Sequence, residues 1–361
     1  MRVNTSFINI LSCIINCTDV DWWQFQHFTS IDWGCFYAKS KQQGVVAIVF
    51  DKINEIPKEI APPKDVLLKW YTQSLSIESQ QKAKDAISIE LSEKLYRRGI
   101  ETVILKGLAY ASYYPNPYHR ESGDVDCYLM GKKDEGDRVV KELGCEIRGA
   151  GYKHSHIHYK GLIFENHKYI TSFDNTKLGI KTERILQTLI TEGCKPIGNT
   201  KLLCPSADFN AIFLVKHAQR HFLKEGIRIR HLLDWVFFLN AEASNINWEK
   251  VLPIMEECRI LNFAKVITSI CVEKLGLKID VKELICTDKL TEKVVDDILG
   301  DQPGIYNESG VQKIRRMFRR LYRMWKFRSL AGERFIRLVW NNLIFCSYFR
   351  RYINFKMNLC K

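Results

Sequence analysis

The sequence contains no hydrophobic run long enough to cross a bilayer, which takes about 20 apolar residues. Its longest apolar and aromatic piece, residues 335–349, is interrupted by Arg337, Asn341 and Asn342. The 12 cysteines include no Cys-x-x-Cys pair and follow no regular spacing, so a disulfide framework is not indicated. Residues 1–17 lack the charged start, long apolar centre and cleavage site of an export signal. We therefore expect a cytoplasmic protein with free thiols.

Internal repeats and low-complexity tracts are also missing. With 361 residues, of which 46% are hydrophobic, the chain can bury a full core, and its length alone suggests about two domains. These features exclude a disordered or fibrous protein.

Positive charge is concentrated at one end of the chain. Residues 311–361 contain 14 lysines and arginines but a single acid, Glu333, so this segment carries the whole formal charge of +13. The remaining residues hold 40 basic and 40 acidic side chains. The body is therefore neutral, with no bias toward nucleic acid, whereas the C-terminal segment favours an anionic partner.

Periodicity divides the chain into four regions. Residues 1–100 predict helices, including a long one over about 64–98. Residues 101–175 alternate between strands and helices, residues 176–305 predict helices again, and residues 306–361 form a basic aromatic tail. We expect an α+β fold: a small mixed β-sheet flanked by N-terminal and C-terminal helical regions.

The alternating region sets the expected sheet. A turn at Tyr159-Lys160-Gly161 separates its last two strands. Strands are expected at 102–106, 124–130, 153–159 and 162–170, and helices at 108–114 and 134–143.

A strand, a glycine turn and two aspartates stand close together in this region. The apolar run 103–105 predicts a short buried strand, and Gly107 lets the chain turn tightly into the next helix. Asp124 and Asp126 alternate along a strand, so their side chains project from one face. Two such carboxylates repel unless a positive charge neutralises them, and Mg²⁺ prefers oxygen ligands of this kind. The pattern indicates a metal site that handles nucleotides.

Two-metal nucleotidyl transfer needs a third carboxylate, so that two cations about 4 Å apart can be bridged. Glu165 is the candidate, because it lies within an otherwise apolar predicted strand, where an unpaired charge is costly. The alternative is an ion pair with Lys160 or Lys168 at the edge of the sheet.

These residues together resemble a known family. The segments are similar to the Leu-Lys-Gly, Arg, Gly-Asp-hydrophobic-Asp and Glu-x-His elements of bacterial uncharacterised nucleotidyltransferases, of the DNA polymerase beta-like nucleotidyltransferase superfamily. They are Lys106-Gly107, Arg120, Gly123-Asp124-Val125-Asp126 and Glu165-Asn166-His167. The resemblance covers roughly residues 20–260, including the helical segment from His217 to Asp234, and leaves the tail uncovered.

The resemblance implies Mg²⁺-dependent transfer of a nucleoside monophosphate from a nucleoside triphosphate, such as ATP, to an acceptor hydroxyl. By position, Asp124 and Asp126 would hold two Mg²⁺ ions and Glu165 would complete the ligand set. One feature departs from the superfamily, which has Gly-Ser or Gly-Gly at the phosphate turn, whereas Leu108 follows the glycine here. A hydroxyl contact to the triphosphate is thus missing; Lys106 compensates only if its side chain faces the site.

Two charged residues, Arg120 and Asp234, are expected to form polar contacts, and Arg120 has two interpretations. Arg120 either binds the triphosphate through two of its guanidinium nitrogens or forms an ion pair with Asp124 or Glu121. Asp234, between apolar neighbours, is expected to pair with Arg230 on the same helix.

Histidines supply the remaining candidates. His167 shares the face of Glu165 and suits a phosphate contact or a supporting role behind it, and His217 and His221 are expected to line the nucleotide or acceptor cleft, with interior packing as the alternative. Three more histidines alternate along one predicted strand, and a row of hydrogen-bonded or solvent-facing histidines is favoured there over a metal site. They are His154, His156 and His158.

The tail predicts a basic amphipathic helix followed by an aromatic segment at 335–355. Its expected apolar stripe is Ile314, Met317, Phe318, Leu321 and Trp325. Such a segment fits an anionic membrane surface, at the inner face of the membrane, or nucleic acid through residues 311–361; docking on the protein's own body is the alternative. The leading hypothesis is a nucleotidyltransferase whose acceptor is a protein, RNA, sugar or small molecule. The competing one is a non-catalytic nucleotide-binding or regulatory module of the same fold.

Overall fold

The computed structural model describes residues 2–149, 151, 153–172, 176–287, 289–300 and 310–332. Its centre is one mixed β-sheet, in which seven strands follow the order β3-β4-β5-β2-β1-β7-β6. The pairs β2–β5 and β1–β7 are parallel, and the other neighbours are antiparallel. The strands are β1 Thr102–Ile104, β2 Val125–Tyr128, β3 Glu146–Arg148, β4 His154–Tyr159, β5 Leu162–His167, β6 Cys194–Pro196 and β7 Leu202–Pro205.

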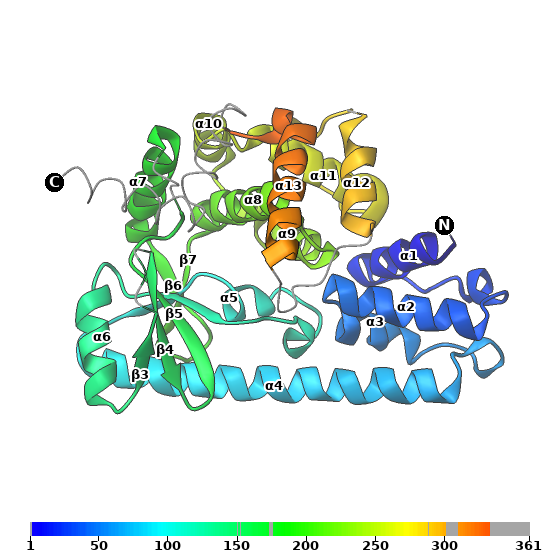
Figure 1. The fold of residues 1–361 in the computed structure, drawn as a ribbon, viewed down its shortest axis with the longest axis horizontal. Helices are drawn as coiled ribbons and strands as arrows, with labels where there is room; N and C mark the ends of the chain where they lie inside the picture. Colours follow the sequence, from blue (N-terminus) through cyan, green and yellow to red (C-terminus); the bar gives the residue numbers. More distant parts are fainter. Residues whose placement is uncertain are drawn as a thin grey trace.

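Helices surround this sheet (Figure 1). Four α-helices precede the first strand in the described part of the chain: α1 Arg2–Asn16, α2 Ser30–Gln43, α3 Val46–Ile53 and α4 Lys64–Tyr96. Two more, α5 Leu108–Ala111 and α6 Lys133–Glu142, lie between the first three strands in the sequence. The rest are α7 Lys177–Glu192, α8 Ala207–Lys224, α9 Ile229–Glu242, α10 Trp248–Glu257, α11 Leu261–Leu275, α12 Leu290–Leu299 and α13 Gly310–Lys326. The predicted α+β class, with a mixed sheet between two helical regions, is confirmed.

The long helix α4 joins the N-terminal helices to the sheet. It contacts α2 and α3 and also β1, β7 and α6, and Figure 1 shows it running along one side of the molecule. Trp70 of α4 is fully buried and its indole nitrogen donates to the carbonyl of Val46. No helix in the described residues combines the length and the apolar character needed to cross a membrane.

The two central strands place the predicted motif as the sequence indicated. Val103, Ile104 and Leu105 are completely buried, and Leu105 N donates to Asp126 O over 2.9 Å. Gly107 follows with φ of +66°, a backbone conformation that favours glycine. The helix after it, α5, is shorter than expected and has only four residues.

The β4–β5 hairpin has the predicted turn. Lys160 and Gly161 both have positive φ, which is typical of a two-residue hairpin loop. Tyr159 is therefore opposite Leu162, and further along the hairpin His154 is opposite His167.

Three strands were not expected. β3 pairs with β4, and β6 and β7 form a hairpin inside a stretch predicted to be helical; β7 then pairs with β1. Each has only three or four residues, too few to show an alternating pattern. These strands form because they pair with β1 or β4 or with each other, and the local sequence periodicity does not predict them.

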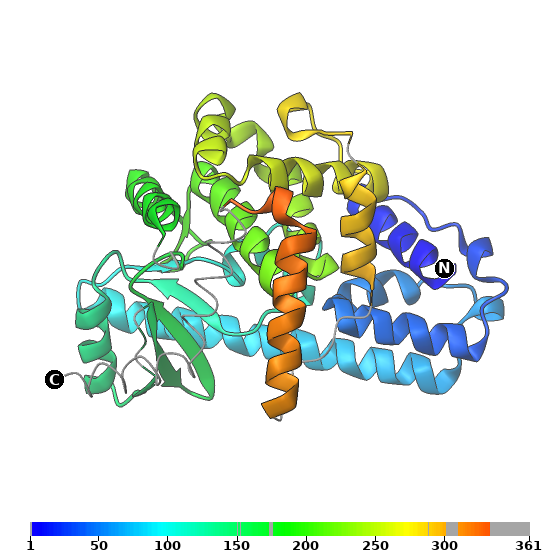
Figure 2. The same cartoon turned by 45° about the horizontal axis from the view of Figure 1, so that its top comes forward.

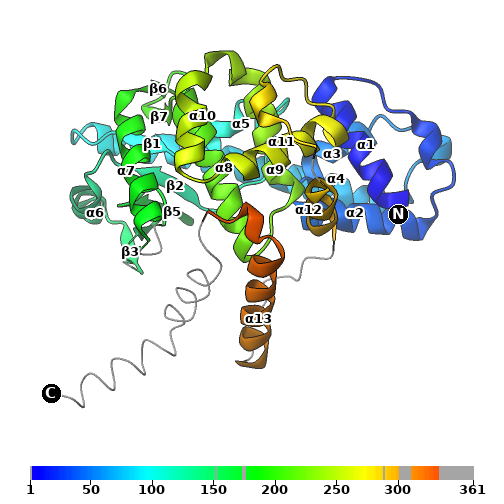
Figure 3. The same ribbon diagram turned by 90° about the horizontal axis from the view of Figure 1, so that it is seen from above.

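Helix α13 and the residues just after it bury other side chains than those of the predicted apolar stripe. Met324 near the end of α13, and Phe327 and Leu330 just after the helix, pack into the body, and the Phe327 ring lies 4.6 Å from that of Phe222 on α8. Phe318 and Trp325, two residues of the predicted stripe, are exposed. In the view of Figure 2 the N-terminal end of the helix extends past α4, and Figure 3 shows most of the helix projecting from the body. The aromatic segment 335–355 lies outside the described residues.

Candidate active site

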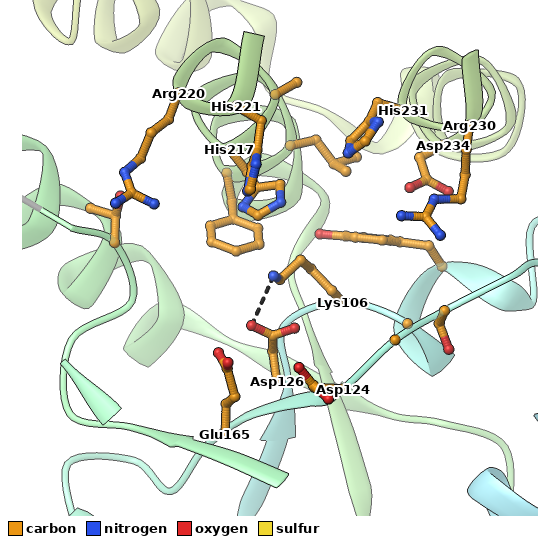
Figure 4. Close-up of a pocket in the computed structure, with 18 of the residues that line it drawn as sticks. Lys106, Asp124, Asp126, Glu165, His217, Arg220, His221, Arg230, His231 and Asp234 are labelled. Atoms are coloured by element: carbon orange, nitrogen blue, oxygen red, sulfur yellow. Dashed lines mark ion pairs between the residues drawn. The ribbon is translucent and has the colours of Figure 1, made fainter. Parts of the chain in front are cut away.

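A cavity of about 450 Å³ lies between the sheet and the helices α8 and α9. The ends of β1, β2, β4 and β5 form one wall, and the opposite wall comes from α8 and α9 (Figure 4). Nine of the ten residues predicted for the site line this cavity: Lys106, Gly107, Arg120, Gly123, Asp124, Asp126, Glu165, His217 and His221. The tenth, His167, is buried behind Asp126 and Glu165.

The three predicted carboxylates face the same space. Because β2 and β5 are parallel neighbours, Asp126 stands in register with Glu165. Asp126 is buried, whereas Asp124, which precedes the strand, is exposed. Figure 4 shows all three side chains pointing into the cavity. The expected neighbouring-strand arrangement of Asp126 and Glu165 is therefore present.

Lys106 faces the site. Its Nζ lies 2.8 Å from Asp126 Oδ1, so the ammonium group neutralises the buried carboxylate. Burial alone would raise the pKa of Asp126, but Lys106 and His167 hold that pKa well below its ordinary value. Asp126 is thus an anion that positive charge already contacts.

Glu165 contacts histidines, and Lys160, one of its two predicted alternative partners, pairs with Glu90. Its carboxylate lies 3.6 Å from His154 Nδ1 and 3.4 Å from His167 Nε2. In the described residues, the potential ligand atoms of His154, Glu165 and His167 lie within 4.8 Å of one another, and neither Asp124 nor Asp126 belongs to this group.

The opposite wall carries cations and neutral imidazoles. Burial lowers the pKa of His221 to about 4, so this ring is uncharged at neutral pH. Arg220 has a buried Nε without a hydrogen-bond partner among the described residues. Lys153, next to β4, also lines the cavity, and burial with the nearby Lys106 lowers its pKa to about 8. The cavity therefore has acids on one side and positive charge around them.

Arg120 has a partner that the sequence did not indicate. Its Nε and Nη2 bind both oxygens of Asp234 over 2.8 and 2.9 Å, and Tyr114 donates to the same carboxylate over 2.7 Å. The expected ion pairs of Arg120 with Asp124 or Glu121 are therefore wrong. The expected pair Arg230–Asp234 is wrong as well, since Arg230 Nη1 donates to the Glu121 carbonyl. The Arg120–Asp234 pair ties the loop before β2 to α9.

Helix α4 holds the segment immediately before Asp124. Lys84 Nζ donates to the carbonyls of Ser122 and Gly123, both over 2.7 Å, and Ser122 Oγ donates to Gln81. Burial and the nearby Arg120 lower the pKa of Lys84 to about 8. The position of Asp124 is thus fixed by a helix distant in sequence.

Lys153 and Arg220 were not predicted from the sequence, and His154 was assigned to a solvent-facing row. The signal for His154 was available: a two-residue loop at Lys160-Gly161 fixes the register of β4 against β5 and brings His154 opposite His167. No comparable local signal marks Lys153 or Arg220.

Comparison with protein families gives one match. The model of a family described as uncharacterised nucleotidyltransferase matches residues 29–276. The match runs from the start of α2 to the end of α11 and includes every residue that lines the cavity. Comparisons with curated proteins and with solved structures give no match.

Proposed function

Because the chain belongs to the family of uncharacterised nucleotidyltransferases, we propose that it transfers a nucleoside monophosphate from a nucleoside triphosphate to an acceptor hydroxyl, as a member of the DNA polymerase beta-like superfamily. The observation that carries the proposal is the in-register pair Asp126 and Glu165, with Asp124 beside it, at the wall of a cavity rich in cations. The hydroxyl oxygen bonds to the α-phosphorus, the bond to pyrophosphate breaks, and the hydroxyl proton passes to water.

Asp124, Asp126 and Glu165 are the residues that would hold divalent cations, with Mg²⁺ as the expected ion. The fit rests on their chemistry: carboxylate oxygens are the ligands that Mg²⁺ prefers, and the Lys106 ammonium already contacts Asp126 Oδ1. When bound, such ions neutralise phosphate charge and lower the pKa of the attacking hydroxyl. His167 sits behind Asp126 and Glu165 and orients both side chains.

The triphosphate lies between the carboxylates and α8. Lys106 and Lys153 on the sheet side and Arg220 on α8 supply positive charge there, and Arg220 Nε, which lacks a hydrogen-bond partner among the described residues, offers a donor. These cations offset the hydroxyl missing at the Gly107-Leu108 turn. His217 and His221 contribute uncharged hydrogen-bonding groups, which suit a base or an acceptor.

Nucleotide binding tests the proposal. Isothermal titration in Mg²⁺ with ATP, GTP, CTP and UTP should detect binding of at least one nucleotide, and Asp124→Asn should weaken it at least tenfold. Asp134→Asn, an exposed carboxylate on α6 outside the cavity, is the matched control and should leave affinity unchanged. If none of the four nucleotides binds, the proposal is wrong. Binding without any transfer to an acceptor would favour the non-catalytic module instead.

We propose a second role, membrane binding, for α13. Phe318, Tyr322 and Trp325 are 62, 61 and 51% exposed, and Arg315, Arg316 and Arg319 are also exposed. Two other arginines anchor the helix: Arg320 pairs with Glu225, and Arg323 pairs with Asp297. Exposed aromatics beside arginines match an anionic lipid surface, where rings enter the interface and cations meet headgroups.

Sedimentation with vesicles tests this role. The full chain should bind vesicles that contain phosphatidylserine and not neutral vesicles, and a Phe318→Ala/Trp325→Ala double variant should lose at least tenfold in affinity. Equal binding of the native protein and the double variant would contradict it. Binding to RNA but not to lipid would assign α13 to nucleic acid.

A further inference from the structure

We propose that the Glu165 end of the cavity is a site for a divalent transition-metal ion, with His154, His167 and Glu165 as ligands, and that it selects such an ion over Mg²⁺. The inference deepens the proposed function and rests on it, because the two share Glu165. It makes a separate claim, about the identity of the metal.

Three strands converge on this site. His154 on β4 is opposite His167 on β5, and Asp126 on β2 is opposite Glu165 on β5, so all four side chains project from one face of the sheet. Ligand atoms of His154, Glu165 and His167 lie within 4.8 Å of one another. His167 Nε2 is also 3.1 Å from Asp126 Oδ1. The clustered ligand atoms come from two neighbouring strands, β4 and β5, and so meet at one place, whereas three histidines along one strand are nearly collinear.

The orientation of His167 suits a metal ligand. Its Nδ1 lies 3.1 Å from the carbonyl of Tyr169, and because a carbonyl only accepts, Nδ1 carries the hydrogen. Nε2 then points at oxygens of Asp126 and Glu165. The Lys106 ammonium already contacts the Asp126 oxygen, whereas the Glu165 oxygen and Nε2 are two electron-rich atoms that need a positive species between them, a proton or a metal ion. Metal-binding histidines usually donate their other ring N–H to a carbonyl or carboxylate in this way.

His154 provides an independent observation. Its Nδ1 is buried and has no hydrogen-bond partner among the described residues, although it lies 3.6 Å from Glu165 Oε2. A buried polar atom without a partner is costly and calls for an explanation. A metal ion on the lone pair of this nitrogen would satisfy it.

The ligand set determines which metal fits. Two imidazole nitrogens and one carboxylate suit Mn²⁺, Fe²⁺, Co²⁺ or Zn²⁺, with water in the remaining positions, whereas Mg²⁺ favours oxygen ligands alone. Asp124, an exposed carboxylate that precedes β2, is outside the histidine cluster and keeps the chemistry of an Mg²⁺ ligand. The two ends of the carboxylate row therefore differ in metal preference.

Metal titration of the full chain, stripped with chelator and free of nucleotide, tests the inference. Calorimetry should show one equivalent of Co²⁺ bound at least tenfold more tightly than Mg²⁺. His154→Gln should weaken Co²⁺ at least tenfold and change Mg²⁺ affinity less than twofold. His158→Gln is the matched control, because His158 lies on the same strand and face but opposite Ile163, and it should bind Co²⁺ as the native protein does.

Further measurements locate the ion. His221→Gln should leave Co²⁺ binding unchanged; its loss in that variant would put the ion on α8 and overturn the inference. Strong sulfur-to-cobalt charge-transfer absorption would put the ion on a cysteine and would overturn the inference as well. Pulsed electron paramagnetic resonance of Mn²⁺ bound to the unmutated protein should show coupling to imidazole nitrogen, and its absence contradicts the inference even if His154→Gln fails to fold. Since no nucleotide is present, these outcomes are independent of nucleotide binding or transfer.

Discussion

Replacing Arg120 with methionine should destabilise the protein strongly, because Arg120 is the buried partner of a buried carboxylate. Both side chains of the Arg120–Asp234 pair are over nine-tenths buried, and two hydrogen bonds join them. Removing one member of such a pair leaves an uncompensated charge and costs about 3–5 kcal/mol. The remaining contact, from the Tyr114 hydroxyl over 2.7 Å, cannot neutralise Asp234.

Urea unfolding at neutral pH, followed by circular dichroism, measures this loss as a lower midpoint. Tyr114→Phe is the graded control, since it removes one hydrogen bond to a charged group and should cost about 1.5–3 kcal/mol. Arg120→Met combined with Asp234→Leu should recover part of the loss, because neither member of the pair is then left as a buried charge without its partner.

The result that refutes this reasoning is specific. If Arg120→Met lowers the free energy of unfolding by less than about 1 kcal/mol, the pair does not hold the loop before β2 to α9. If the variant keeps its stability but loses nucleotide affinity, Arg120 binds phosphate, as the sequence alone allowed.

Three further predictions concern the glycine turn, α13 and acid stability. Gly107→Ala should lower the free energy of unfolding in urea by about 1–3 kcal/mol, because a φ of +66° is strained for any residue with a side chain. The new Cβ itself would have room, since its nearest neighbours would lie 3.9 Å away. Unchanged stability would contradict this. Phe327→Ala should cost about 3–5 kcal/mol by the same measurement, whereas Phe318→Ala, at an exposed position, should have almost no effect; equal losses would mean that α13 is docked differently. Burial raises the pKa of Asp234, but the Arg120 guanidinium outweighs burial and keeps this pKa below its ordinary 3.8. The stabilisation from the pair should therefore be intact at neutral pH and be lost as the pH falls below about 3.8. Urea midpoints measured across pH 2–7 should fall less in Arg120→Met than in the native protein.

Local sequence patterns predicted the parts of the site that lie on one strand or at one turn. The buried run before Gly107 and the alternation of Asp124 and Asp126 predicted the two strands β1 and β2, although β2 begins one residue after Asp124. The neighbouring position of Glu165 was also expected, because it is an acid in an apolar strand. In each case short-range periodicity carries the information.

Contacts between distant segments could not be predicted in the same way. Asp234 is 114 residues from Arg120, and the choice between Arg120 and the nearby Arg230 depends on how α9 packs on the loop before β2. The β6–β7 hairpin exists because β7 pairs with β1, and its few residues show no periodicity. Lys153 and Arg220 reach the cavity through the packing of β4 and α8, which sequence spacing does not describe.

Transfer of label from nucleotides tests the central claim most directly. The full chain is incubated with Mg²⁺, cell extract and each nucleoside triphosphate labelled at either the α- or the γ-phosphate. We predict that α-label, and not γ-label, becomes attached to an acceptor, and that Asp124→Asn lowers the rate by about 10²–10³-fold, the scale expected for removing one charge-stabilising group, while Asp134→Asn does not. Transfer of γ-label, or α-label transfer that survives Asp124→Asn undiminished, would contradict the proposed nucleotidyl transfer.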